Sequence, residues 1–299
     1  MKSDHPLVSI GLPVFNSEKT IVRALDSLLA QNYPNFEIIV SDNSSTDKTA
    51  EICKEYAQRD HRIKLHLNKK NLGINANFKI VCEKAVGKYF MWAAGDDFWE
   101  PEFAATLVKE LESDPRIGVA FCAVKRQYPD GRPFDTIAFD KKYNPNNLSK
   151  LRIAAKLLSP KKQIKRLKYN LFIYGLFRYE VVKGALSLDD ILTYGERAFL
   201  SPIALGYRFR YIGSVLFVKT VYEKKFKQRN PDDEYVRNKK KIKYREFYYR
   251  IMGWITKSPD IPIINKLFVF VILYYISYIY IDKKKRKLFK VILPTGTKK

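Results

Sequence analysis

The chain has 299 residues, of which 46% are hydrophobic and 14% aromatic, so a sizeable core can form and disorder is not expected. Its formal net charge is +24, and residues 224–299 hold 21 Lys and Arg against 6 Asp and Glu, so this segment alone carries +15. Cys53, Cys82 and Cys122 are far apart, which excludes a CxxC zinc site and a disulfide framework and indicates a reducing compartment. The first six residues lack the apolar region of a signal peptide, so a cytoplasmic location is expected.

Residues 1–122 alternate between apolar runs typical of strands and segments with apolar residues at helical spacing. Short polar side chains at Ser45, Thr46 and Asp47 favour a helix start there, as N-cap residues do. Strands are predicted at 7–12, 36–40, 63–67, 88–93 and 117–122, and helices at 21–29, 45–56, 75–84 and 102–111. This alternation predicts an α/β fold with a mixed, mainly parallel sheet flanked by helices.

The middle of the chain, residues 123–222, is less regular. The sequence Pro129-Asp130-Gly131 predicts a turn within a hairpin. Further on, the pattern predicts loops at 144–147 and 159–162, helices at 178–187 and 196–205, and two short strands within 208–219 around Gly213.

The segment 223–299 is predicted to be a basic, helical extension. Residues 232–254 are basic and rich in tyrosine, and residues 267–281 form an almost unbroken apolar run that the basic stretch 283–287 follows. A helix over that run is about 22 Å long, which is short of the roughly 30 Å hydrocarbon core of a bilayer. A helix lying in the interface of an anionic membrane is therefore favoured. A helix buried against the first domain and a membrane-spanning helix are the alternatives.

An acidic step, Gly95-Asp96-Asp97, follows the predicted strand at 88–93. Ligands of open α/β sheets bind outside the carboxyl ends of the strands, where these two carboxylates are expected to lie. Hard divalent cations prefer such oxygen ligands. The alternative is a polar cap for the helix that follows Glu100-Pro101.

Four motifs resemble those of glycosyltransferase family 2 in order and spacing: residues 8–16 (VSIGLPVFN), 38–47 (IIVSDNSSTD), 71–73 (NLG) and 95–97 (GDD). The resemblance covers roughly residues 7–220. It implies a GT-A (Rossmann-like) domain over 1–222, with a nucleotide-sugar half at 1–122 and an acceptor half at 123–222. It also implies inverting transfer of a sugar from a nucleotide diphosphate sugar, with UDP the expected nucleotide and Mn²⁺ or Mg²⁺ as the cofactor.

The resemblance assigns the donor-binding residues. Asp42 resembles the family carboxylate that accepts a hydrogen bond from the base, and a uracil N3–H suits an acceptor-only group. Its alternative role is to cap the turn at 44–49, and Asn77 is a weaker candidate for the donor site. The other residues placed near the nucleotide are Pro13, Phe15, Asn16, Asn71 and Gly73.

The resemblance makes Asp96 the metal-ligating aspartate of the DxD motif and Asp97 the carboxylate beside it. The sequence departs from the motif because Ala94 stands where the first aspartate is expected. The cation is then expected to bind through Asp96, the diphosphate oxygens and water. It would neutralise the departing nucleoside diphosphate.

The catalytic base is expected at the start of a helix on the acceptor side. Glu196, followed by Arg197, resembles a variant of the family's acidic dipeptide, with Asp189 and Asp190 as reserves. The alternative is an acid that is favourable in the first turn of a helix. Residues 174–178 resemble the acceptor-side strand and receive no chemical role.

These features predict a glycosyltransferase that is peripheral at the cytoplasmic face of a membrane and transfers to a glycan or lipid-linked acceptor. The QxxRW signature of processive relatives is absent, which favours addition of one sugar in polysaccharide biosynthesis. No nucleic-acid partner is expected, because the apolar run at 267–281 suits lipid better than phosphate. A catalytically silent relative that binds glycan or nucleic acid is the alternative.

Overall fold

The structure is a computed structural model that describes residues 5–140, 144–158, 169–186 and 196–223, together with positions 253, 255–256, 261–264 and 266–267. The chain divides into two compact units, 1–240 and 241–299. The predicted boundary at 222/223 stays a prediction, since residues 224–250 lie outside the described ranges. So do most of the helices predicted at 232–254 and 267–281. Among the residues that the structure describes, none of the helices combines the length and apolar character needed to cross a membrane.

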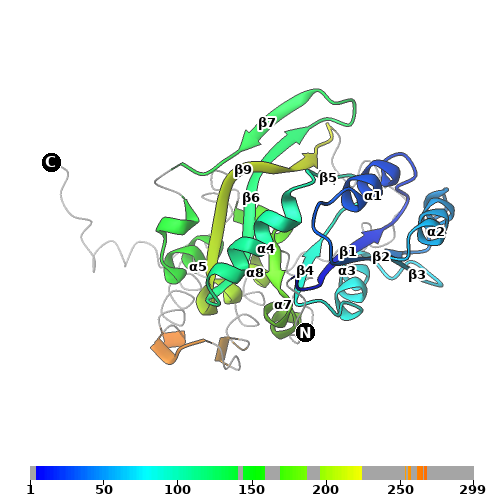
Figure 1. The fold of residues 1–299 in the computed structure, drawn as a ribbon. Coiled ribbons are helices and arrows are strands. Elements are labelled where there is room, and N and C mark those ends of the chain that lie inside the picture. The colour runs from blue at the N-terminus through cyan, green and yellow to red at the C-terminus, as the bar shows by residue number, and fades with distance from the viewer. Residues whose placement is uncertain are drawn as a thin grey trace, which may run out of the picture. The chain divides into compact units, whose positions relative to one another are not determined.

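The first half of the larger unit is a parallel sheet with helical crossovers (Figure 1). β1 and β2 pair over seven residues, from Val8 opposite Phe36 to Val14 opposite Asp42, and both strands are buried throughout. Burial on both faces explains why these strands are apolar runs rather than alternating patterns. The elements are β1 (Val8–Val14), α1 (Ile21–Leu29), β2 (Phe36–Asp42), α2 (Thr49–Arg59), β3 (Ile63–Leu67), α3 (Ile74–Glu83) and β4 (Tyr89–Trp92).

The second half extends the same sheet, giving the described strands the order β3-β2-β1-β4-β8-β6-β9-β5, with β7 paired to β6. β8 is antiparallel to both β4 and β6, whereas the long β6–β9 pairing is parallel. The sheet is therefore mixed and mainly parallel, as predicted. The elements are β5 (Phe98–Trp99), α4 (Phe103–Ser113), β6 (Ile117–Gln127), β7 (Pro133–Ile137), η1 (Pro145–Asn147), α5 (Lys150–Leu158), η2 (Tyr169–Tyr174), β8 (Leu176–Arg178), α7 (Tyr179–Leu186), α8 (Glu196–Gly206) and β9 (Arg208–Thr220).

Three local predictions are wrong for identifiable reasons. Helix α2 begins at Thr49 rather than near Ser45, because Ser45 bonds to Asp42 within the preceding loop. The two strands predicted around Gly213 are the single strand β9, whose pairing with β6 is irregular after Ile212. The loop predicted at 144–147 contains the 3₁₀ turn η1, which the Asn144 side chain caps. The loop predicted at 159–162 lies outside the described residues.

A buried arginine at the end of β8 holds the turn between α4 and β6. Arg178, at the end of β8, is 8% exposed and donates to the carbonyl oxygens of Ile117 (2.8 Å), Asp114 (3.2 Å) and Leu111. These carbonyls lie around the end of α4 and the start of β6, where helix geometry leaves acceptors without partners. Arg178 therefore holds the turn between α4 and β6 in place, and its role is structural.

Candidate active site

Hydrogen bonds connect the polar segments that follow β1 and β2, and Asp42 is the last residue of β2. Asp42 is 2% exposed, and its two carboxylate oxygens accept from the Ser45 hydroxyl (2.5 Å) and the Ser45 N–H (3.0 Å). Asn16, which has a left-handed φ of 48°, accepts from the Thr46 N–H at 2.9 Å and donates its own N–H to the Ser45 hydroxyl. Asp42 thus holds its own turn, the alternative role foreseen for it. Its role toward a nucleotide base stays a prediction.

Pro13 is buried within β1, and Phe15 is half-buried just after the strand. Gly73 begins α3 with a φ of 83°, a left-handed conformation that side chains disfavour. The Asn71 side chain accepts from the Gly73 N–H and from Asn43, both at 2.8 Å. Loop geometry therefore accounts for Asn71 and Gly73, while all of these residues lie at the ends of β1 and β2 or in the loop before α3.

Two buried amides connect these loops; the sequence offered Asn77 as a weaker candidate for the donor site, whereas Asn43 was not singled out. Asn43 is 3% exposed and accepts from the Leu72 N–H (3.0 Å) and from Asn68 (3.2 Å). Asn77 is also 3% exposed, donates to the Ser41 carbonyl (3.0 Å) and accepts from the Ser41 hydroxyl (2.7 Å). Buried amides with several partners make the edge of the sheet rigid. Their signal in the sequence is weak, because surface loops are also rich in asparagine.

Asp96 lies in the loop between β4 and β5, against the end of β1. A Cβ added at Gly95 would meet side-chain atoms of Val14 and Ser17 at 3.3 Å, so the loop packs closely against the end of β1. The Asp96 backbone oxygen accepts from Arg23 (3.2 Å) and from the Thr220 hydroxyl. Its half-buried carboxylate forms no hydrogen bond or ion pair with the part of the chain that the structure describes. Asp96 is therefore a candidate ligand for a cation.

Asp97 has a different environment. It is fully buried, and its carboxylate accepts from the Thr220 N–H (2.8 Å) and from the Lys219 ammonium (3.2 Å). Burial raises the pKa of Asp97 to about 6, while the Lys219 charge acts in the opposite direction. Both oxygens of Asp97 are thus engaged by β9, which leaves Asp96 as the better candidate for a metal ligand.

Within the described residues, no group of three or more His, Cys, Asp or Glu side chains could hold a metal ion by itself. A cation at Asp96 needs oxygen ligands from another source, and a diphosphate supplies them. The residues present therefore fit a cation that arrives with its nucleotide better than a cation held by the protein alone.

Glu196 is the first residue of α8, and it is exposed. Helix α8 packs against η2, and the negative charge of Glu196 is among the causes that raise the pKa of Tyr174, of which burial is the largest. Asp189 and Asp190 lie outside the described residues, as does the Arg197 side chain. Of the acids predicted as possible bases, Glu196 is therefore the one that lies within the described residues.

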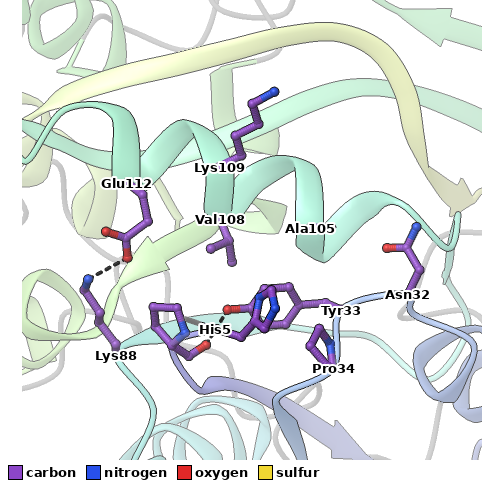
Figure 2. A pocket seen from close by; sticks show the side chains of 10 residues that line it. His5, Asn32, Tyr33, Pro34, Lys88, Ala105, Val108, Lys109 and Glu112 are labelled. Carbon is purple, nitrogen blue, oxygen red and sulfur yellow. Dashed lines mark hydrogen bonds and ion pairs between the residues drawn. The ribbon is translucent and has the colours of Figure 1, made fainter. Parts of the chain in front are cut away.

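A pocket of about 830 Å³ is lined by none of these residues. Figure 2 shows the residues that line it. It is lined by α4 residues that include Val108 and Glu112, and by the loop around Tyr33. Lys88, which forms an ion pair with Glu112 at 2.5 Å, immediately precedes β4, so the pocket lies at the amino end of that strand. The predicted site residues lie at the opposite ends of the strands, and the pocket has no part in the site.

Comparisons with known proteins identify the family of the chain. A sequence model of the family described as Glycosyl transferase family 2 matches residues 9–174, more than half of the chain. Glycosyltransferase GlyA of Streptococcus pneumoniae is 35% identical over 114 residues, which are 37% of this chain and 16% of GlyA. The uncharacterized glycosyltransferase EpsJ of Bacillus subtilis is 30% identical over 174 residues, which are 58% of this chain and 47% of EpsJ. The chain spans less than half the length of these curated relatives.

Solved structures share the fold. S. aureus TarS 1–349 in complex with UDP-GlcNAc matches with a TM-score of 0.60 at 20% identity, over 91% of this chain and 73% of TarS 1–349. The mannosyltransferase PcManGT from Pyrobaculum calidifontis, in complex with GDP-Man and Mn²⁺, matches with a TM-score of 0.52 at 18% identity, over 97% of this chain and 80% of PcManGT. The fold is thus the GT-A fold, and the chain belongs to glycosyltransferase family 2.

Proposed function

We propose that this chain is an inverting, metal-dependent glycosyltransferase that moves one sugar from a nucleotide diphosphate sugar, with UDP the expected nucleotide, to a glycan or lipid-linked acceptor. The observation that carries the proposal is the half-buried carboxylate of Asp96 beside the end of β1, which has no hydrogen-bond or ion-pair partner in the described part of the chain. Membership of the family and the nucleotide-sugar complexes of TarS and PcManGT support it.

In this proposal the two parallel strands hold the donor. Asp42 accepts a hydrogen bond from the base, and Pro13, Phe15 and Asn16 line the pocket for the base and ribose. The loop at 71–73 lies near the nucleotide. Asp96 holds the cation, while Asp97 anchors the acidic loop through its hydrogen bonds to β9. The cation, when bound, neutralises charge on the departing diphosphate.

Transfer then needs a base on the acceptor side. Glu196 removes the proton from the acceptor hydroxyl as its oxygen attacks the anomeric carbon. The bond between that carbon and the diphosphate oxygen breaks, and the electron pair leaves with the nucleoside diphosphate. Attack from the face opposite the leaving group inverts the anomeric configuration.

A thermal-shift screen tests the donor class. UDP with Mn²⁺ at about 100 times its Kd is expected to stabilise the fold by about 2.7 kcal/mol, which raises the Tm by several degrees. GDP and dTDP with Mn²⁺ are the matched comparisons, and UDP without the metal is expected to shift the Tm less. Transfer or hydrolysis of UDP-sugars is then measured directly. A chain that binds no nucleotide and releases none from any sugar donor would falsify the proposal.

Membrane association is a second part of the proposal, and the charge of residues 224–299 supports it. Binding to vesicles with anionic lipid is expected, with little binding to neutral vesicles or, at physiological salt, to duplex DNA. Glutamine in place of all five basic residues at 283–287 is expected to weaken vesicle binding about 100-fold or more, since each contributes about 1 kcal/mol near the surface. A matched control replaces five exposed lysines of the first unit, Lys54, Lys69, Lys70, Lys84 and Lys125. Equal loss in both variants would show that net charge, and not this segment, determines binding.

A further inference from the structure

A half-buried lysine links the acidic loop to the acceptor half. Lys219, near the end of β9, donates to the Asp97 carboxylate at 3.2 Å and to the Tyr174 hydroxyl at 2.8 Å. Its side chain is 24% exposed, whereas that of Asp97 is fully buried. The ammonium also lies 4.2 Å from the centre of the Tyr174 ring. One cation therefore compensates the buried charge of Asp97 and holds a tyrosine from another element.

The end of β9 also fixes the loop on its other side. The Thr220 N–H donates to Asp97 at 2.8 Å, and its hydroxyl donates to the Asp96 carbonyl. Arg23 donates to the same carbonyl (3.2 Å) and to the Thr220 hydroxyl (3.0 Å). These bonds engage the Asp96 backbone and the whole Asp97 carboxylate. The Asp96 side chain has no hydrogen-bond or ion-pair partner among the residues described, so β9 and Arg23 hold the backbone that carries this carboxylate.

Tyr174 lies on the acceptor side of the sheet. It ends η2, and its ring stacks on Phe217 at 5.2 Å, which in turn stacks on Trp99 at 5.4 Å. Helix α8, which begins at Glu196, packs against η2. The hydrogen bonds of Lys219 to Asp97 and Tyr174 thus connect the acidic loop of the donor site to η2, against which the helix with the proposed base packs.

We propose that Lys219 is a positioning residue, which sets the distance between Asp96 and the acceptor side by bonding Asp97 and Tyr174 at once. The inference rests on the proposed function, and it concerns the alignment of the two halves rather than binding of the donor. A displacement of about 1 Å at a reacting centre can lower the rate about 100-fold while binding contacts elsewhere remain. Loss of Lys219 therefore affects kcat more than the KM of the donor.

The test compares Lys219→Met, Lys219→Arg and Tyr174→Phe in the full chain, with Lys125→Met on the neighbouring strand β6 as the control. Lys219→Met is expected to lower kcat about 10–100-fold with the KM of the donor changed less than about threefold. Lys219→Arg restores most of the activity because it keeps the charge and the donors. Tyr174→Phe keeps the ring stacking and breaks only the hydroxyl bond, with an expected loss of about tenfold in kcat.

If Lys219→Met does not fold, Tyr174→Phe still tests whether the bond between Lys219 and Tyr174 affects kcat, because phenylalanine keeps the aromatic packing. Turnover within about twofold of wild type in Tyr174→Phe and in any folded Lys219→Met would overturn the inference, as would a rise in KM alone. A wild-type chain that turns over no donor overturns the proposed function and this inference together. An active wild type with unaffected variants overturns only the inference.

Discussion

Replacement of Glu196 by glutamine is expected to lower kcat about 10²–10⁴-fold, the usual contribution of a general base. Glutamine keeps the size of the side chain and its place in the first turn of α8, but it cannot accept the proton of the acceptor hydroxyl. The KM of the donor is expected to change little, because the role proposed for Glu196 is toward the acceptor. Steady-state transfer with a UDP-sugar and a competent acceptor measures both constants.

The matched control is Glu180→Gln. Glu180 is also an exposed acid in the first turn of a helix, α7, so its substitution removes the same favourable interaction with the helix dipole. If both variants retain wild-type turnover, Glu196 is only a helix-stabilising acid and the base is elsewhere. Equal losses of Tm with unequal losses of kcat would separate the two roles.

Replacement of Asp96 by asparagine is expected to lower kcat about 10²–10³-fold, similar to the loss of one group that stabilises charge in a transition state. The amide is neutral and binds a divalent cation more weakly than a carboxylate does. The expected signature is a loss of the additional stabilisation that Mn²⁺ gives in the presence of UDP. Thermal shift with and without the metal measures this effect independently of turnover.

Asp130→Asn serves as the control for Asp96→Asn. Asp130 is exposed in the turn between β6 and β7, where it pairs with Arg132 at 2.8 Å, far along the chain from the acidic loop. Its substitution removes one negative charge without touching the proposed site. An Asp96→Asn variant that keeps both turnover and the Mn²⁺-dependent shift would remove Asp96 from the metal site.

Much of the first half was predictable because its signals are local. The apolar runs of β1 and β2 and the helical spacing of α1 each occupy a few consecutive residues. The second half was harder, since β8 has only three residues and the bulge in β9 depends on its register with β6. Short strands and bulges are defined by their partners, which a single segment of sequence does not reveal.

The candidate site divides in the same way. The sequence by itself determined the family, the α/β class and the presence of Asp42 and Asp96 at strand ends, because each motif is a short run with its own chemistry. Only the tertiary structure decided that Asp97 is engaged by Lys219 and Thr220, while the Asp96 carboxylate has no hydrogen-bond or ion-pair partner among the described residues. These partners are 122 and 123 residues away from Asp97 along the chain, and only the folded sheet brings β9 to the acidic loop. Asp96 and Asp97 are adjacent in sequence, yet burial and the surrounding strands give their two carboxylates different environments.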